Sequence, residues 1–387
     1  MQVFFSSDFK LGILGGGQLG KMLVSETNRL AIFSQVLDPD ADAPSRHSCH
    51  KFVHGDFMDF DTVYNFGKEV NVLTIEIEHV NIEALFALEK IGVSVQPAAK
   101  VLALIQNKIT QKQFFTQNEL PTAPYTTYKI DELHLLEART LPFVWKAATG
   151  GYDGKGVRII RSKADVAALP QVACVAEDLV GIAQEIAVLV ARNQRGEVAV
   201  YEPVSMLFDK TANLVEYVVF PSDLSPEIAE KAKKMAVATA QKLEICGLLA
   251  VEMFLLPNQE ILINEVAPRP HNSGHLTIEA CHTSQFEQHL RAVLNLPLGS
   301  THALCPAVMA NFVGEPEQYG AVFYENAAET LAISGLNLYF YGKKQTKPYR
   351  KMAHATIVGK TTEECMQKAQ QAKELLKITT LTNSIKA

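Results

Sequence analysis

The chain has 387 residues, a formal net charge of −6 and 48 % apolar residues, a composition typical of a globular enzyme with two or three packed domains. Its lysines and arginines form no basic tract, which argues against a nucleic-acid partner. The absence of an apolar run of about 18 residues, of a secretory pattern and of Cys-x-x-Cys pairs predicts a cytoplasmic protein without a membrane span or zinc site.

The first 40 residues contain a glycine-rich turn between two predicted strands, at residues 11–14 and 32–37. Gly15, Gly17 and Gly20 open a predicted helix over residues 21–29, and Asp38 follows the second strand. This pattern predicts a Rossmann-like unit. Because the same turn occurs in many domains that bind no dinucleotide, NAD binding remains only an alternative.

Further strands are predicted at residues 51–53, 70–75 and 93–95, with helices at 59–68 and 81–91, so residues 1–107 read as one doubly wound α/β domain. Ligands of such sheets bind at the carboxyl ends of the strands. Glu76 and Glu78 follow the fourth strand. They are either surface acids or substrate contacts.

A second region begins after helices predicted at residues 99–107 and 108–118, where prolines break the pattern. Strands predicted at 141–145 and 157–160 flank the loop 146–156, which carries four glycines and two lysines. Glycine N–H groups can bind phosphates, and Lys146 and Lys155 would add positive charge. The alternative is a flexible hairpin with solvated lysines.

The middle of the chain is predicted to be mostly strand. The signals are a strand over 173–177, a pair over 185–191 and 197–202, a strand over 215–220, and a helix over 226–243. Ser225 can cap that helix, and Pro226 suits its first position.

Two acids follow on a predicted hairpin of residues 248–256 and 260–266. Glu252 lies opposite Glu265 if the loop has four residues and opposite Asn264 if it has three. Either register gathers two carboxylates and one amide oxygen, which are ligands suited to Mg²⁺. The alternative is two acids that face solvent.

Polar residues follow this hairpin and recur near the C-terminus. Arg269 and His271 lie in a loop fixed by two prolines, where they could hold a phosphate or bicarbonate, or could simply be surface residues. The last third is expected to be a small β-rich domain that closes over the site. It carries a basic cluster, or a solvated basic loop, of Lys343, Lys347, Arg350 and Lys351.

The segments GGYDGKG and PRPHNSGH resemble the ATP-dependent N5-carboxyaminoimidazole ribonucleotide synthetases of the ATP-grasp superfamily, and the likeness extends from GGGQLG to RKMAH. The resemblance implies an α/β (α+β) ATP-grasp fold. Its implied parts are a Rossmann-like pre-ATP-grasp domain (1–107), a lid with the glycine-rich loop (108–185), a core with the magnesium hairpin (186–300) and a C-terminal β-rich domain (301–387).

The resemblance also implies a reaction. ATP, bicarbonate and 5-aminoimidazole ribonucleotide give ADP, phosphate and N5-carboxyaminoimidazole ribonucleotide through carboxyphosphate, in purine biosynthesis. A homodimer is expected on the same ground. The competing interpretations are another ATP-grasp carboxylate–amine ligase, an NAD-dependent oxidoreductase and a non-catalytic nucleotide-binding module.

The site residues that the resemblance implies fall into four groups. Catalysis would use Arg269, His271 and Lys343, and the metal ligands would be Glu252, Asn264 and Glu265. ATP would contact Lys108, Lys146, Gly151, Tyr152, Asp153, Gly154, Lys155, Gly156, Val157, Glu177, Asp178, Leu179, Val180, Glu185, Phe208, Asn264 and Glu265. The ribonucleotide would contact Glu76, Glu78, Tyr152, Lys155, Asn272, Lys343, Lys347 and Arg350.

Two positions depart from the family pattern. Phe208 stands where the family usually has histidine, and Lys347 stands where it often has arginine. Phenylalanine cannot donate to a phosphate, and lysine neutralises one without the planar fork of arginine.

Overall fold

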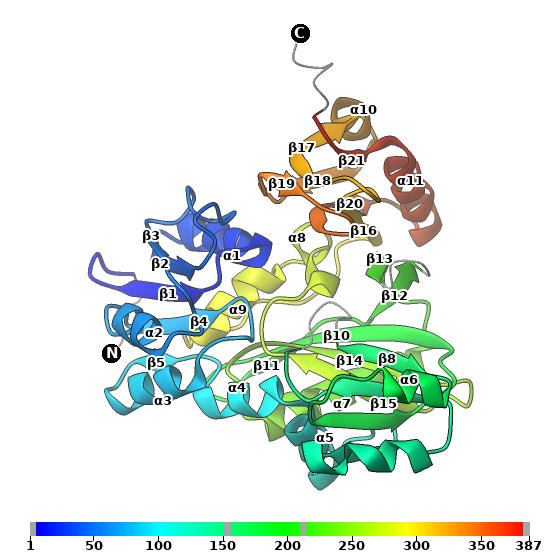
Figure 1. The fold of residues 1–387 in the computed structure, drawn as a ribbon. Helices are drawn as coiled ribbons and strands as arrows, with labels where there is room; N and C mark the ends of the chain where they lie inside the picture. Colours follow the sequence, from blue (N-terminus) through cyan, green and yellow to red (C-terminus); the bar gives the residue numbers. More distant parts are fainter. Residues whose placement is uncertain (1–4, 151–155, 210–213, 382–387) are drawn as a thin grey trace.

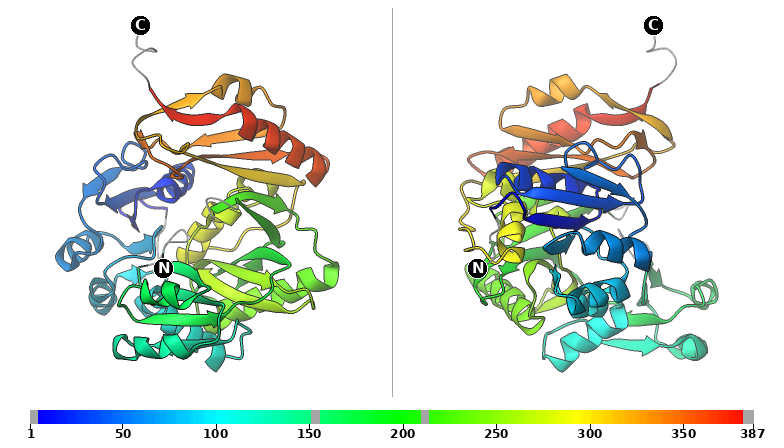
Figure 2. Two further views of the ribbon diagram at one scale, coloured as in Figure 1. Left: turned by 45° about the vertical axis from the view of Figure 1, so that its right-hand side comes forward. Right: turned by 90° about the vertical axis from the view of Figure 1, so that its left-hand side faces the viewer.

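The computed structural model describes residues 5–150, 156–209 and 214–381. Figure 1 shows the N-terminal domain (blue) beside a central sheet, with the C-terminal strands (orange to red) at one end. Both views of Figure 2 place that C-terminal region at the end of the molecule away from α5 and the lid. Within the described ranges, no helix is both long and apolar enough to cross a membrane.

The N-terminal domain is a parallel five-stranded sheet in the order β3-β2-β1-β4-β5. The central strands β1, β2 and β4 are almost entirely buried, as expected where helices cover both faces, whereas the edge strand β3 is not. This confirms the predicted doubly wound domain. Its elements are β1 (Lys10–Leu14), α1 (Gln18–Arg29), β2 (Phe33–Asp38), β3 (Lys51–His54), α2 (Phe60–Gly67), β4 (Val72–Ile75), α3 (Ile82–Lys90) and β5 (Ser94–Val95).

Two helices lead from this domain to the lid, α4 (Ala99–Gln106) and α5 (Lys108–Gln117). The lid is an antiparallel sheet in the order β6-β9-β7-β8 around the buried Trp145 and Phe143. The first strand and the 3₁₀ segment of the lid were not predicted. Its elements are β6 (Tyr125–Tyr128), η1 (Ile130–Ala138), β7 (Phe143–Ala147), β8 (Val157–Ile160), α6 (Lys163–Ala167) and β9 (Cys174–Asp178).

The core is a mostly antiparallel sheet whose described strands follow the order β15-β14-β10-β12-β13-β16-β20-β18. The long helix α7 (Pro226–Lys242) packs on β10, and Ser225 caps it as predicted. Strand β12 and helices α8 and α9 were not predicted. The core elements are β10 (Gln184–Arg192), β11 (Val198–Val200), β12 (Val204–Asp209), β13 (Leu214–Phe220), β14 (Gly247–Leu255), β15 (Ile261–Ala267), η2 (Asn272–Gly274), α8 (Thr277–Ala280) and α9 (Gln285–Val293).

The C-terminal region shares this sheet, because β16 pairs with β13. Strand β21 lies in a segment for which no structure was predicted. The predicted boundaries of the four domains, after residues 107, 185 and 300, remain predictions. The elements are β16 (Ala307–Val313), β17 (Gly320–Glu325), α10 (Ala327–Leu331), β18 (Leu336–Phe340), β19 (Gln345–Thr346), β20 (Lys351–Val358), α11 (Thr362–Leu375) and β21 (Lys377–Thr380).

Helix α9 ties the core to the N-terminal domain. Its residues Phe286, Leu290 and Val293 belong to the same apolar cluster as Leu11 and Ile13 of β1, and Figure 1 shows α9 beside β1 and β4. The N-terminal domain is therefore held against the core by a shared hydrophobic cluster.

Candidate active site

The predicted acidic pair lies on the hairpin of β14 and β15. Glu252 pairs with Glu265, and the register shifts at Met253 so that Asn264 forms a bulge. This is the register with the two acids opposite each other. Burial raises the pKa of Glu252, and the Glu265 carboxylate raises it further, whereas the Lys108 ammonium lowers the pKa of Glu265. A divalent cation would relieve the repulsion between these carboxylates.

Two lysines reach this hairpin from different elements. Lys108, at the start of α5, forms an ion pair with Glu265. Lys146, at the end of lid strand β7, donates to Asn264 Oδ1 at 2.8 Å and pairs with Glu177 Oε2 at 3.0 Å. Lys108 and Lys146, two of the three lysines predicted to contact ATP, therefore lie beside the predicted metal ligands.

Lys112 also joins this network, although it was not predicted as a site residue. It is 1 % exposed, pairs with Glu177 Oε1 at 2.9 Å and donates to Thr122 Oγ1 at 2.5 Å. Burial lowers its pKa to about 8. The spacing of Lys108 and Lys112 puts both on one helix face, and that signal could have identified it.

The loop after β15 brings its arginine and histidine to the same place. Arg269 Nε pairs with Glu78 Oε2 at 2.8 Å, across to the N-terminal domain. His271 Nε2 lies 3.3 Å from Glu252 Oε1, and its Nδ1 lies 2.9 Å from Ser273 Oγ. The loop thus joins the acidic hairpin to the carboxyl end of β4.

Glu76 occupies a different position, under the glycine turn. Its Oε1 accepts from the N–H of Gly17 at 3.1 Å, and Asp38 Oδ2 accepts from the N–H of Gly16 at 2.6 Å. A Cβ at Gly15 would lie 2.5 Å from Glu76 Cγ, so the turn needs glycine there. The N–H groups that a dinucleotide phosphate would need already donate to the protein's own carboxylates, which argues against the NAD interpretation.

The predicted adenosine contacts lie at the end of β9 and just after it, on β10 and on β12. Asp178 pairs with Arg139 at 2.6 Å, and Leu179 beyond it is 39 % exposed. Burial raises the pKa of Glu185 on β10 to about 7. Phe208 packs against the apolar cluster that also contains Met206 of β12. Val180 follows Leu179 directly in the chain.

The glycine-rich loop is described only in part. Gly156 adopts a positive φ of 85°, and Val157 begins β8 with 40 % exposure. The predicted contacts Gly151, Tyr152, Asp153, Gly154 and Lys155 lie outside the described residues.

The predicted ribonucleotide contacts of the C-terminal region, Lys343, Lys347 and Arg350, lie between β18 and β20. Lys343 Nζ donates to Lys351 O at 2.7 Å, and Arg350 donates to Gln345 O at 2.7 Å. Lys347 is exposed. The positive charge of Lys351, which was not predicted as a contact, acts on the Glu252 carboxylate.

Asn272 has a protein partner. Its side-chain amide exchanges two hydrogen bonds with that of Asn311 on β16, at 2.9 and 2.8 Å. This pair fixes η2 against the central sheet.

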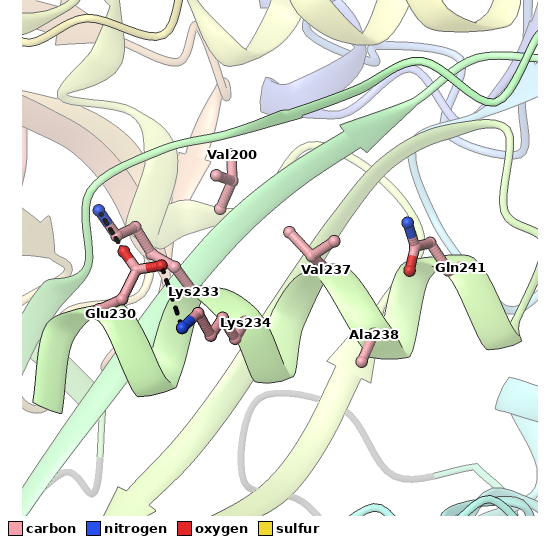
Figure 3. A pocket seen from close by; sticks show the side chains of 7 residues that line it. All are labelled: Val200, Glu230, Lys233, Lys234, Val237, Ala238 and Gln241. Carbon is pink, nitrogen blue, oxygen red and sulfur yellow. Dashed lines mark ion pairs between the residues drawn. The ribbon is translucent and has the colours of Figure 1, made fainter. Parts of the chain in front are cut away.

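A hollow of about 250 Å³ lies elsewhere, between α7 and β11 (Figure 3). In this view Lys233 and Lys234 both pair with Glu230 on the outer face of α7. Its lining includes none of the predicted site residues. It is formed by Val200, Glu230, Lys233, Lys234, Val237, Ala238 and Gln241.

Three family descriptions match consecutive parts of the chain. Residues 9–106 match the ribonucleotide synthetase preATP-grasp domain, residues 113–286 the ATP-grasp domain, and residues 307–368 the phosphoribosylaminoimidazole carboxylase C-terminal domain.

Curated relatives cover nearly the whole chain. The chain is 35 % identical over 363 residues to N5-carboxyaminoimidazole ribonucleotide synthase of Bacillus subtilis, covering 92 % of this chain and 93 % of that protein. It is 38 % identical over 360 residues to the chloroplastic phosphoribosylaminoimidazole carboxylase of Vigna aconitifolia, covering 90 % of this chain but only 64 % of that longer protein.

Solved structures agree with the sequence relatives. N5-carboxyaminoimidazole ribonucleotide synthetase from Thermotoga maritima superposes with a TM-score of 0.87 at 40 % identity, covering 96 % of this chain and 100 % of that one. The Aspergillus clavatus synthase in complex with ADP and 5-aminoimidazole ribonucleotide gives 0.85 at 32 % identity, covering 95 % and 98 %. The parallel N-terminal sheet, the lid and the acidic hairpin thus form an ATP-grasp fold, and the chain belongs to the N5-carboxyaminoimidazole ribonucleotide synthase family.

Proposed function

We propose that this chain carboxylates 5-aminoimidazole ribonucleotide with ATP and bicarbonate, giving N5-carboxyaminoimidazole ribonucleotide, ADP and phosphate, as a step of purine biosynthesis. The observation that carries the proposal is the meeting of Glu252 and Glu265 with Lys108, Lys146 and His271 from four separate segments. The names of the relatives and the ribonucleotide complex of the Aspergillus clavatus protein support this choice of substrate.

ATP would lie between the lid and the hairpin. Lys108 and Lys146 would neutralise its phosphates, and residues 151–157 would also contact the nucleotide. Glu185 can accept from both ribose hydroxyls as a carboxylate. The adenine would lie against the segment after β9, close to Phe208, with Glu177, Asp178, Leu179 and Val180 around the ring.

Mg²⁺ would be held by Glu252, Glu265 and Asn264. The residues fit, since all three supply oxygen ligands and the Glu265 carboxylate raises the pKa of Glu252, a repulsion that a cation would offset. Among the described residues, no group of three or more His, Cys, Asp or Glu is arranged for a metal, so phosphate oxygens would complete this site. When bound, the ion supplies charge neutralisation for phosphoryl transfer.

The chemistry overcomes the weak electrophilicity of bicarbonate. A bicarbonate oxygen attacks the γ-phosphorus, ADP leaves, and carboxyphosphate forms. The amine of the ribonucleotide then takes the carboxyl group, either directly or as released CO₂, and phosphate leaves. Arg269 and His271 would hold bicarbonate and its phosphorylated form, and exclusion of water by the lid would protect that form from hydrolysis.

The ribonucleotide would be held by the N-terminal domain on one side and by the C-terminal region on the other, with the loop after β15 between them. Glu78 is better placed than Glu76, because it pairs with Arg269 whereas Glu76 supports the glycine turn. The other contacts would be Tyr152, Lys155, Asn272, Lys343, Lys347 and Arg350.

We also propose a cytoplasmic homodimer, and sedimentation velocity that shows only monomer at micromolar concentration would contradict the dimer.

The test is ADP release with ATP and Mg²⁺ while bicarbonate and the ribonucleotide are omitted in turn. Dependence on both is expected. Arg269→Ala should lower kcat about 100-fold or more, because a preorganised charge at the reacting group is lost. Arg195→Ala is the control, since the Arg195 side chain is 45 % exposed and pairs with Glu197, away from the predicted site.

The remaining outcomes separate the alternatives. Turnover with a different carboxylate would identify another ligase. ATP binding without bicarbonate-dependent turnover would indicate a non-catalytic module, and NADH binding would support the oxidoreductase. Wild-type turnover by Arg269→Ala would refute the role of Arg269.

A further inference from the structure

We propose that Gln285, the first residue of α9, is a positioning residue that fixes His271 by clasping its backbone. This inference rests on the proposed function for its kinetic test. It concerns a residue outside the predicted site.

The clasp uses both ends of the Gln285 side chain. Oε1 accepts from the N–H of His271 at 2.8 Å, and Nε2 donates to the carbonyl of His271 at 2.8 Å. Nε2 also lies 3.1 Å from Nδ1 of His275. Gln285 is fully buried. Because the amide has separate donor and acceptor ends, the two bonds fix both the position and the rotation of the His271 backbone.

The surrounding residues are shaped for this approach. A Cβ at Gly274 would lie 2.4 Å from Gln285 Oε1, so the loop passes the glutamine only because residue 274 is glycine. Thr277 Oγ1 accepts from the N–H of Gln285 at 2.8 Å and donates to Gly274 O at 2.6 Å. Both the side chain and the backbone of Gln285 are therefore held to the loop.

Helix α9 fixes the position of this loop relative to the N-terminal domain. It packs in the apolar cluster of the N-terminal domain, as described above, and that domain also carries Glu78, the partner of Arg269. Gln285 thus sets His271 relative to Arg269 and Glu78. The His271 imidazole, 3.3 Å from Glu252, would lose that setting if the backbone could turn.

Helix α9 also provides a matched control. Gln288 is equally buried, and it clasps Gly299 in the same way. Gln288 Oε1 accepts from the N–H of Gly299 at 2.8 Å, and Nε2 donates to its carbonyl at 2.8 Å. Gly299 is in the connection to β16 and belongs to no predicted site.

The experiment compares Gln285→Met with Gln288→Met in the full chain. Both variants lose a buried two-bond clasp, so similar falls in Tm are expected. Only Gln285→Met should lower kcat for bicarbonate-dependent ADP release, by about ten- to a hundredfold, with KM for ATP unchanged. Hydrogen exchange should accelerate at the His271 amide in Gln285→Met and at the Gly299 amide in Gln288→Met.

An equal kcat in the two variants, or an unchanged His271 exchange rate in Gln285→Met, would overturn the inference. If Gln285→Met does not fold, the isosteric Thr277→Val takes the same measurements, and an unaltered kcat would count against the clasp. If the wild type shows no bicarbonate-dependent turnover, the proposed function fails, while the exchange rates still decide whether Gln285 holds His271.

Discussion

Lys112 and Lys146 share one carboxylate, that of Glu177, and all three side chains are buried. Burial of a charge is costly unless a partner offsets it, so each lysine depends on Glu177 and Glu177 depends on both. Since Lys146 also reaches Asn264, the arrangement links the lid to the hairpin through single side chains.

Lys112→Met should lower the free energy of unfolding by about 3 kcal/mol, because it leaves a buried carboxylate with one cation fewer. Urea denaturation measures the change. Lys100→Met is the control: its ion pair with Glu244 is shorter, at 2.6 Å, but both side chains are 64 % exposed, so no measurable change is expected. Equal effects of the two substitutions would contradict the role assigned to burial.

At the scale of elements, the backbone just before β18 closely approaches β20. Gly335 precedes β18 with a φ of 83°, and its carbonyl accepts from the N–H of Val358 at 2.9 Å. A Cβ at Gly335 would lie 2.4 Å from Val358 O. Gly92 has a similar φ of 91° but has open space around it.

Comparing these two glycines separates backbone conformation from crowding. Gly92→Ala should cost about 1 kcal/mol for the left-handed conformation alone. Gly335→Ala should cost about 2–4 kcal/mol, because the methyl group must also displace the β20 backbone. Chemical denaturation of both variants is the measurement, and similar losses would mean that the approach at Val358 relaxes without cost.

At the scale of the whole molecule, His289 of α9 connects the N-terminal domain to the core. Its Nδ1 accepts from the N–H of Leu248 at 3.1 Å, and its Nε2 therefore donates to Thr74 Oγ1 of β4 at 2.8 Å. Only the neutral imidazole can make both hydrogen bonds, because one ring nitrogen must accept and the other must donate. Burial lowers the pKa of His289 to about 3.

Acid should therefore weaken this connection. Between about pH 6.5 and pH 3 the unfolded chain binds a proton at His289 that the folded chain does not, so stability falls as pH drops. Between pH 6.5 and 5, the wild type should lose about 1.6 kcal/mol more than His289→Gln. The unfolding free energies of both proteins are measured across this range. Parallel pH profiles would show that protonation of His289 does not contribute to the pH dependence of stability.

Much of this protein was predictable from local patterns. The parallel domain, the α7 cap and the acidic hairpin are determined by apolar runs, turn residues and spacing within about 20 residues, and the structure has them where they were expected. Family resemblance added the ATP-grasp fold and the proposed chemistry. Helix α9 and strand β21 were missed, because α9 packs against β1 and β21 pairs with β17, which are distant in the chain. Strand β12 was also missed, although it pairs with the neighbouring strand β13.

What only the tertiary structure decided is which polar groups meet. Sequence alone indicated that Glu76 and Glu78 end one strand, but the fold turns Glu76 under the glycines and leaves Glu78 with Arg269. It also buried Lys112 behind Glu177 and set Gln285 on the His271 backbone. Periodicity reports which face of an element is apolar, whereas the partner of a buried charge or amide depends on distant segments that pack together only in the folded chain.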